Sequence, residues 1–161
     1  LAYYIYARRQ YDRAVHHLLA VIEMEPTFYL AHCVLGLAYA QQAMPHEAVR
    51  AFEKACALSA GNPFTLGMLA YGLGKAGRSQ EARTIIEKLS ADAQRSYVPA
   101  KSLMFAWAGL DDAQNVLSWA EKSLDDRDPM TIMNLIQEPV LDFVRSDPRY
   151  QALLHKIKLP C

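Results

Sequence analysis

The glycine-rich segment 72–79, Gly-Leu-Gly-Lys-Ala-Gly-Arg-Ser, is the part of the chain that comes closest to a chemical motif. It satisfies G-x-G-x-x-G and departs from the phosphate loop G-x-x-x-x-G-K-[ST] at Arg78, which stands in the place of the lysine. A phosphate loop follows a buried strand and opens a helix whose N-terminus holds the anion. Residues 66–73 have helical spacing instead. We therefore expect the first two glycines inside a helix, Gly77 in a turn, and no nucleotide site.

The remaining reactive side chains are scattered along the chain. No two histidines have the i, i+4 spacing that places two metal ligands on one helix face. The cysteines, Cys33, Cys56 and Cys161, lack metal-ligand and redox spacing, and we expect free thiols, as in a reducing cytosol. No Ser/His/Asp or Cys/His set can be assembled. We expect no catalytic residue, no metal ion and no cofactor.

A fixed period organises the chain. The alanines Ala14, Ala48 and Ala82 follow one another at intervals of 34 residues, and the next step reaches Val116. The same interval joins two further sets of apolar residues: Leu1, Leu35, Leu69 and Leu103, and Leu18, Phe52, Ile86 and Ala120. A period of this length indicates one helical hairpin that is stacked several times.

Within each period, two apolar stripes with helical spacing are separated by a break. We interpret them as the inner faces of two packed helices. Small residues at Gly36, Ala48, Ala70 and Ala82 are expected where the helix axes cross most closely, since a large side chain would push the axes beyond the ~8–10 Å of packed helices.

Local residues set the expected boundaries. Asn62 followed by Pro63 predicts a helix start, and Ser79, Ser96 and Asp147 are candidate N-caps. The expected helices cover 1–8, 11–24, 29–42, 45–58, 63–75, 79–91, 97–109 and 112–125, then about 130–136, 138–146 and 148–158.

This pattern resembles the tetratricopeptide repeat (TPR) family, best over residues 29–60 with Leu35, Gly36, Tyr39, Ala48, Phe52 and Ala55. The resemblance implies an all-α, right-handed superhelix of about three and a half repeats. These would be a partial repeat at 1–26 and full repeats at 29–60, 63–94 and 97–128. Residues 129–161 would form a helical cap over the last repeat, because a terminal repeat otherwise exposes an apolar face.

Such arrays usually present a concave surface to a protein partner, so the expected function is an interaction scaffold that binds a peptide or helix, with no enzymatic activity. The candidate groove residues lie beside the core stripes on one face of the first helix of each repeat: Tyr3, Tyr6, Leu30, Cys33, Val34, Leu37, Phe64, Met68, Tyr71, Lys101 and Phe105. Only Lys101 resembles the cationic and amide residues with which family members clamp a C-terminal carboxylate. The alternative is that neighbouring repeats, residues 129–161 or upstream helices cover this face.

Composition limits the partners. Lysine plus arginine and aspartate plus glutamate both number 17 among 161 residues, and this zero net charge argues against nucleic acid as a partner. No run of about 18 apolar residues predicts a membrane span.

The chain has no initiator methionine, and Leu1 enters a repeat in mid-helix. We therefore expect a longer cytoplasmic protein, and self-association through the cut N-terminal end is a further alternative.

The C-terminal sequence Ser-Asp-Pro-Arg-Tyr-Gln-Ala-Leu-Leu, which is followed by Leu-Pro near the end of the chain, resembles the tails of TPR arrays in bacterial regulators. In that group the array follows a winged-helix domain, a kinase or a cyclase. The alternative function is therefore a sensor or oligomerisation module of a bacterial signal-transduction or transcriptional regulator.

Overall fold

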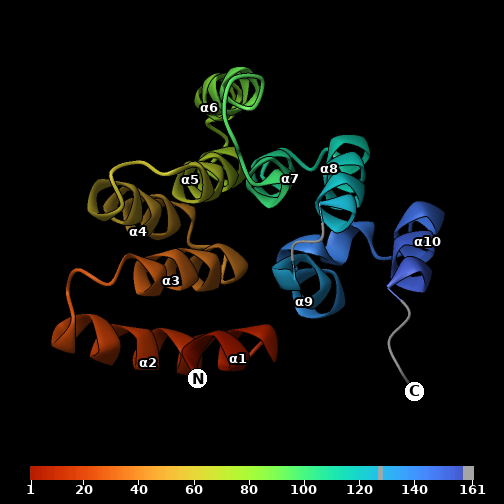
Figure 1. The fold of residues 1–161 in the computed structure, drawn as a ribbon. Coiled ribbons are helices and arrows are strands. Elements are labelled where there is room, and N and C mark those ends of the chain that lie inside the picture. The colour runs from red at the N-terminus through yellow and green to blue at the C-terminus, as the bar shows by residue number, and fades with distance from the viewer. Residues whose placement is uncertain (127–128, 158–161) are drawn as a thin grey trace.

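A computed structural model describes residues 1–126 and 129–157, and within these ranges the chain is helical without any β-strand. The elements are α1 (Ala2–Ala7), α2 (Tyr11–Met24), α3 (Tyr29–Gln41), α4 (Pro45–Leu58), α5 (Pro63–Lys75), α6 (Ser79–Asp92), α7 (Ala100–Ala108), α8 (Ala113–Asp125), α9 (Pro129–Gln137), the 3-10 helix η1 (Pro139–Val144) and α10 (Pro148–Lys156). Helices that follow one another pack in adjacent pairs, and α5 also packs against α7. Figure 1 shows the helices from α1 to α8 following an arc.

The eight helices expected before residue 126 are all present, and most boundaries agree within about one residue. The exception is α7, which begins at Ala100 because Pro99 occupies its N-cap position. Ser96 does not cap this helix, since its hydroxyl donates to the carbonyl oxygen of Asp92 at 3.1 Å. The last expected helix reached residue 158, and that residue lies outside the described ranges.

Two of the expected N-caps are confirmed. The Asn62 Oδ1 accepts from the Thr65 amide at 2.9 Å, and the Asp147 Oδ1 accepts from the Arg149 amide at 2.8 Å. The cap predicted at Ser79 is wrong: this residue is the first of α6, and the preceding residue makes no side-chain cap hydrogen bond. These caps satisfy amide groups that the first helical turn leaves without intrahelical partners.

The turns inside the hairpins share one backbone conformation at the 34-residue interval. A left-handed residue recurs at Arg9, Ala43, Gly77 and Asp111, with φ of 60°, 56°, 76° and 54°. In each turn, the backbone amide of the next residue donates a hydrogen bond to the carbonyl oxygen five residues earlier. These bonds run from Gln10 to Ile5 at 3.2 Å, from Met44 to Tyr39 at 2.9 Å, from Arg78 to Leu73 at 2.9 Å and from Asp112 to Trp107 at 3.3 Å. This bond closes a Schellman-type helix end. Gly77 is thus in a turn, as expected, and the period in sequence is also a period in backbone structure.

The small residues lie where the helices approach most closely. Ala14, Ala48, Ala82 and Val116 are fully buried. The Phe52 ring lies between two glycines: a Cβ atom placed on Gly36 would come within 2.6 Å of the ring, and one on Gly72 within 2.5 Å. The close approach expected at Gly36 is confirmed, and the other three small residues of that prediction, Ala48, Ala70 and Ala82, are fully buried.

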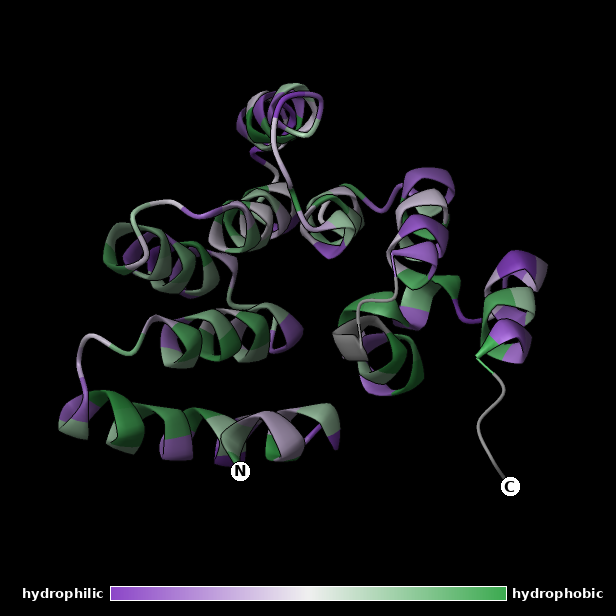
Figure 2. Cartoon of the chain, viewed as in Figure 1, coloured by the Kyte–Doolittle hydropathy of each residue, from purple (hydrophilic) through white to green (hydrophobic). Residues whose placement is uncertain are grey.

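Hydropathy follows this packing. Hydrophobic residues run along α2 and α3, whereas hydrophilic residues are concentrated on α6, α8 and α10 (Figure 2). Within the described part of the chain, every helix is too short or too polar to span a bilayer.

The C-terminal segment does more than cover α8. Both α9 and α10 contact α8, which is the contact expected of a cap. In addition, η1 contacts α3 and α7, so the segment turns back into the arc (Figure 1). The helix expected at 138–146 is a shorter 3-10 helix, in which Leu141 and Val144 are buried.

Candidate ligand-binding cavity

A cavity of about 500 Å³ lies between the array and the C-terminal segment. Its walls come from α1, α2, α3, α5, α7, α9 and the residue before η1. Nine of the eleven residues predicted for the groove line it: Tyr3, Leu30, Cys33, Val34, Leu37, Phe64, Met68, Lys101 and Phe105. Residues that are far apart in sequence are thus brought to one place.

The other two predicted groove residues belong to the protein interior. Tyr6 is fully buried, and its hydroxyl donates to the Glu138 carboxylate at 2.5 Å, because the C-terminal segment covers this side of α1. The ring of Tyr71 packs edge-on against Phe52 at 6.2 Å, and its hydroxyl accepts from the Gln41 amide at 3.3 Å. Assigning them to the groove was wrong because sequence spacing identifies a helix face but not what covers it.

Eight lining residues were not predicted: Leu1, Ala2, Leu18, Val21, Phe28, Ala31, Asn134 and Glu138. Leu18 belongs to one of the periodic apolar sets and Val21 lies one helical turn further along α2, so the stripe that packs the core also reaches the cavity. Asn134 and Glu138 reach the cavity because the C-terminal segment folds back, and the 34-residue period carries no signal for that.

The cavity is apolar inside and open at its rim. Leu37, Met68 and Phe105 are buried in its walls, whereas Phe28 and Leu30 are exposed at its edge. Phe64 meets Phe105 edge-on at 6.5 Å between ring centroids. The ammonium of Lys101 lies 5.7 Å from the Phe64 ring centroid. An apolar ligand that entered would find a preformed surface of aliphatic and aromatic groups.

One side of the cavity carries a polar group of four residues, Tyr3, Tyr6, Asn134 and Glu138, which we call the Glu138 cluster. The Tyr3 hydroxyl lies 3.0 Å from Glu138 Oε2 and 3.3 Å from Asn134 Oδ1, and the Tyr6 hydroxyl lies 2.5 Å from Glu138 Oε1. Glu138 is only 1% exposed. The cluster joins α1 to a segment more than 130 residues further along the chain.

Burial dominates the electrostatics of this cluster. It raises the pKa of Glu138, although hydrogen bonds from both tyrosines and from the Val140 amide act in the opposite direction. Burial, followed by the nearby Glu138 charge, also raises the pKa of the Tyr3 and Tyr6 hydroxyls. Among the described residues, the Glu138 carboxylate accepts hydrogen bonds from neutral donors only.

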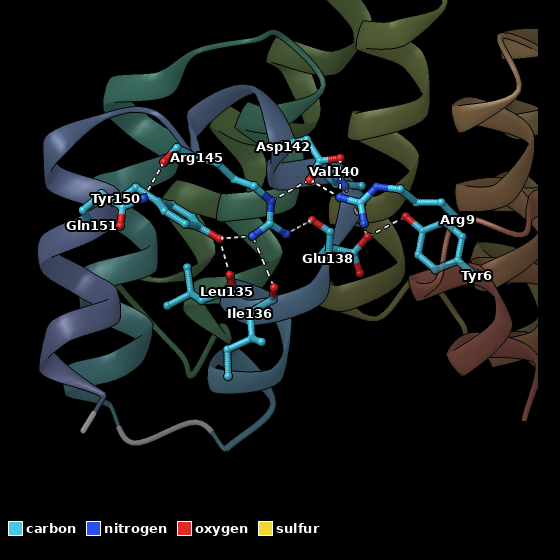
Figure 3. A network of polar contacts seen from close by, with 10 residues as sticks. All are labelled: Tyr6, Arg9, Leu135, Ile136, Glu138, Val140, Asp142, Arg145, Tyr150 and Gln151. Atoms are coloured by element: carbon cyan, nitrogen blue, oxygen red, sulfur yellow. Dashed lines mark hydrogen bonds and ion pairs between the residues drawn. The ribbon is translucent and has the colours of Figure 1, made fainter. Parts of the chain in front are cut away.

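The nearby cations are paired with another carboxylate. Arg9 donates to both oxygens of Asp142, at 2.6 and 2.7 Å, and the Arg145 Nε donates to Asp142 Oδ1 at 2.6 Å (Figure 3). Burial alone would raise the pKa of Asp142, but the two guanidinium groups outweigh it and lower that pKa. Arg145 also binds the Ile136 and Glu138 carbonyl oxygens at 3.2 and 3.4 Å. The Arg9 bonds join the turn between α1 and α2 to the C-terminal segment, and the Arg145 bonds hold that segment together internally.

The raised pKa of Glu138 gives a testable dependence of stability on pH. The native carboxyl holds its proton to higher pH than the unfolded one, whose reference pKa is 4.5. The native state therefore binds more protons above that pH, and stability falls as pH rises. A glutamine at this position has no such loss. We expect the stability of wild type relative to Glu138→Gln to decrease as the pH rises above the unfolded-state pKa of 4.5, as measured by urea unfolding. A difference that stays constant or grows in favour of wild type contradicts the assignment.

The segment 72–79 forms no phosphate loop. Its first half completes α5, where Gly72 packs against Phe52 and a Cβ on Gly74 would lie 2.3 Å from the Gly109 carbonyl oxygen. Lys75 forms an ion pair with Asp111 at 2.5 Å. These glycines serve the close packing of helices.

No protein-family model matches this sequence, and no curated protein is significantly similar to it.

The cysteine thiols and the metal-ligating side chains form no reactive site in the described part of the chain. Cys33 and Cys56 are free thiols, as expected, and Cys161 lies outside the described residues. Burial, with a smaller contribution from Cys56, raises the pKa of the Cys33 thiol to about 12, so this cavity residue is a weak nucleophile. In the ranges that the structure describes, no three His, Cys, Asp or Glu side chains are grouped to hold a metal ion.

Proposed function

We propose that the chain is a TPR-like interaction module that binds an apolar segment of a partner protein in the cavity on the inner side of its arc. The cavity is the observation that supports this proposal, since it collects side chains from α1, α3, α5 and α7 around about 500 Å³ of space. The recurrence of one turn conformation at Arg9, Ala43, Gly77 and Asp111 supports the right-handed superhelix of tetratricopeptide type.

The energy of such binding would come from apolar area. Each buried aliphatic or aromatic side chain of a partner contributes ~1.5–3 kcal/mol of transfer free energy. Phe28 and Leu30 at the rim would bury further apolar surface against the partner. The proposal includes no catalytic step, no cofactor, no nucleic acid and no membrane, and it places the module in the cytoplasm.

A second candidate is the sensor module of a bacterial signal-transduction or transcriptional regulator. The observation in its favour is that Asn134 and Glu138 of the C-terminal segment form part of the cavity wall while the same segment binds α1. A ligand in the cavity would therefore act on the contact between the two ends of the described chain.

Val34→Glu tests the cavity as the binding site. Val34 is half-buried in α3 and lines the cavity. A carboxylate there would have to be desolvated when an apolar partner enters, so we expect partner affinity to fall about tenfold or more. The partner is first trapped by a photo-reactive amino acid placed at Leu30, identified by mass spectrometry, and purified for calorimetric titration.

Leu19→Glu is the matched control. Leu19 is an exposed leucine on α2 that does not line the cavity, so the same change of charge should leave affinity unchanged. If a folded Val34→Glu variant binds the purified partner as tightly as Leu19→Glu does, the cavity is not the binding site.

A further inference from the structure

The chemistry of the cavity goes beyond apolarity, because it has an acidic side. Glu138 lines the cavity, is almost completely buried, and is hydrogen-bonded by Tyr3 and Tyr6 through their hydroxyls. A buried carboxylate is costly unless a cation or several donors compensate its charge. Here the described donors are two hydroxyls and one amide, all of them neutral.

Two guanidinium groups lie close to the cluster and bind another carboxylate, and Lys101, whose ammonium lies 5.7 Å from the Phe64 ring centroid, lines the same cavity. The guanidinium groups of Arg9 and Arg145 both bind Asp142. Arg145 approaches Glu138 only at its backbone carbonyl oxygen, at 3.4 Å. The carboxylate of Glu138 therefore retains the capacity to pair with a cation that comes from outside the described chain.

The surroundings suit an ammonium group on an apolar stem. Tyr3, which lines the cavity, reaches the carboxylate through its hydroxyl at 3.0 Å, so a polar head group at this point meets two oxygen-bearing side chains. The rest of the lining, including Leu37 and Met68, would contact aliphatic carbon. An alkyl chain that ends in an ammonium satisfies both parts of this surface.

We propose that the occupant of the cavity is a lysine side chain within an apolar segment of the partner, with its ammonium paired to Glu138 beside Tyr3. This inference rests on the proposed function and names the residue of the partner that enters the site. The ion pair stabilises the carboxylate, and the flanking apolar side chains of the segment cover Phe28 and Leu30 at the rim.

Three probes with the same alkyl chain separate charge from apolar contact: n-octylammonium, n-octanol and n-octanoate, each titrated calorimetrically into the wild-type chain at neutral pH below its aggregation concentration. We expect octylammonium to bind about tenfold more tightly than octanol, because a charge-assisted hydrogen bond is stronger than a neutral one. Octanoate should bind most weakly. NMR contacts between the octyl chain and the methyl groups of Val34 and Met68 would place the probe.

Glu138→Gln should reduce the affinity for octylammonium to that for octanol, with the helical circular dichroism spectrum retained. Leu19→Glu adds a carboxylate outside the cavity and should leave the order of the three probes unchanged. Should Glu138→Gln fail to fold, the order of affinities in wild type still decides the inference, since it needs no variant.

The outcomes distinguish the two proposals. If octanol binds in the cavity and octylammonium binds no more tightly, the site exists but the inference about charge is overturned. If octanoate binds best, Lys101 rather than Glu138 selects the ligand, and the inference is overturned. If none of the three binds, the cavity is no ligand site and both proposals fail.

A peptide pair tests the source of the ammonium. Ac-Ala-Leu-Leu-Lys-Leu-Leu-Ala-amide should bind more tightly than the same peptide with norleucine in place of lysine. Tight binding of octylammonium with no difference between the two peptides would overturn the assignment to a partner's lysine.

Discussion

Phe52→Ala is expected to lower the free energy of unfolding by about 3–5 kcal/mol, the cost of removing a fully buried phenylalanine and leaving a cavity. Its ring is completely buried between Gly36 and Gly72 and meets Tyr71 edge-on. Both glycine positions are backbone surfaces of α-helices, which relax little, so the space left by the ring should stay open. Urea unfolding, followed by circular dichroism, measures the loss.

Tyr97→Ala is the matched control. It also removes a large aromatic ring, but from a residue that is 76% exposed. A change within about 0.5 kcal/mol is expected there, as for most surface substitutions. Equal losses at the two positions would mean that Phe52 does not hold adjacent repeats together.

Gly67→Ala is expected to destabilise the fold by about 1–3 kcal/mol, although alanine is the better helix former. A Cβ atom at this position in α5 would lie 2.3 Å from the carbonyl oxygen of Ser102 in α7. The obstacle is backbone, so α5 and α7 must move apart, and contacts along both helices would be lost. Urea unfolding again gives the size and sign of the change.

The reverse substitution on an exposed helix surface provides the comparison. Ala20 is exposed in the middle of α2, and Ala20→Gly should cost about 1 kcal/mol from helix propensity alone. Alanine should thus be favoured at position 20 and glycine at position 67. Stabilisation by Gly67→Ala would show that the α5–α7 approach is looser than the structure has it.

The array was predictable because its determinants are local or periodic. Ala14, Ala48 and Ala82 recur at a fixed interval because the same face of each hairpin is buried. Asn62 and Asp147 cap the helices that follow them, and such caps depend only on neighbouring residues. The start predicted at Ser96 is wrong because Pro99, three residues later, occupies the N-cap position and sets the backbone there. Helix existence was therefore more predictable than helix ends.

For the cavity, the sequence predicts only which residues of successive helices lie on the same face. Spacing placed Val34, Phe64 and Phe105 on one side of the arc, and the structure gathers them around one space. The position of Glu138 depends on how a non-periodic segment returns across more than 130 residues, a property of the tertiary fold that no local pattern records. The same return buries Tyr6, which spacing alone placed in the groove.

The bonds between α1 and the C-terminal segment alter how the array can come apart. In an open solenoid each unit touches only its neighbours, so the terminal helices fray first and cheaply. Here Tyr6 and Arg9 cannot separate from the rest without also breaking their contacts with Glu138 and Asp142. End fraying is thereby coupled to loss of the opposite end, which makes unfolding more cooperative. The same contacts raise the contact order and slow the final step of folding.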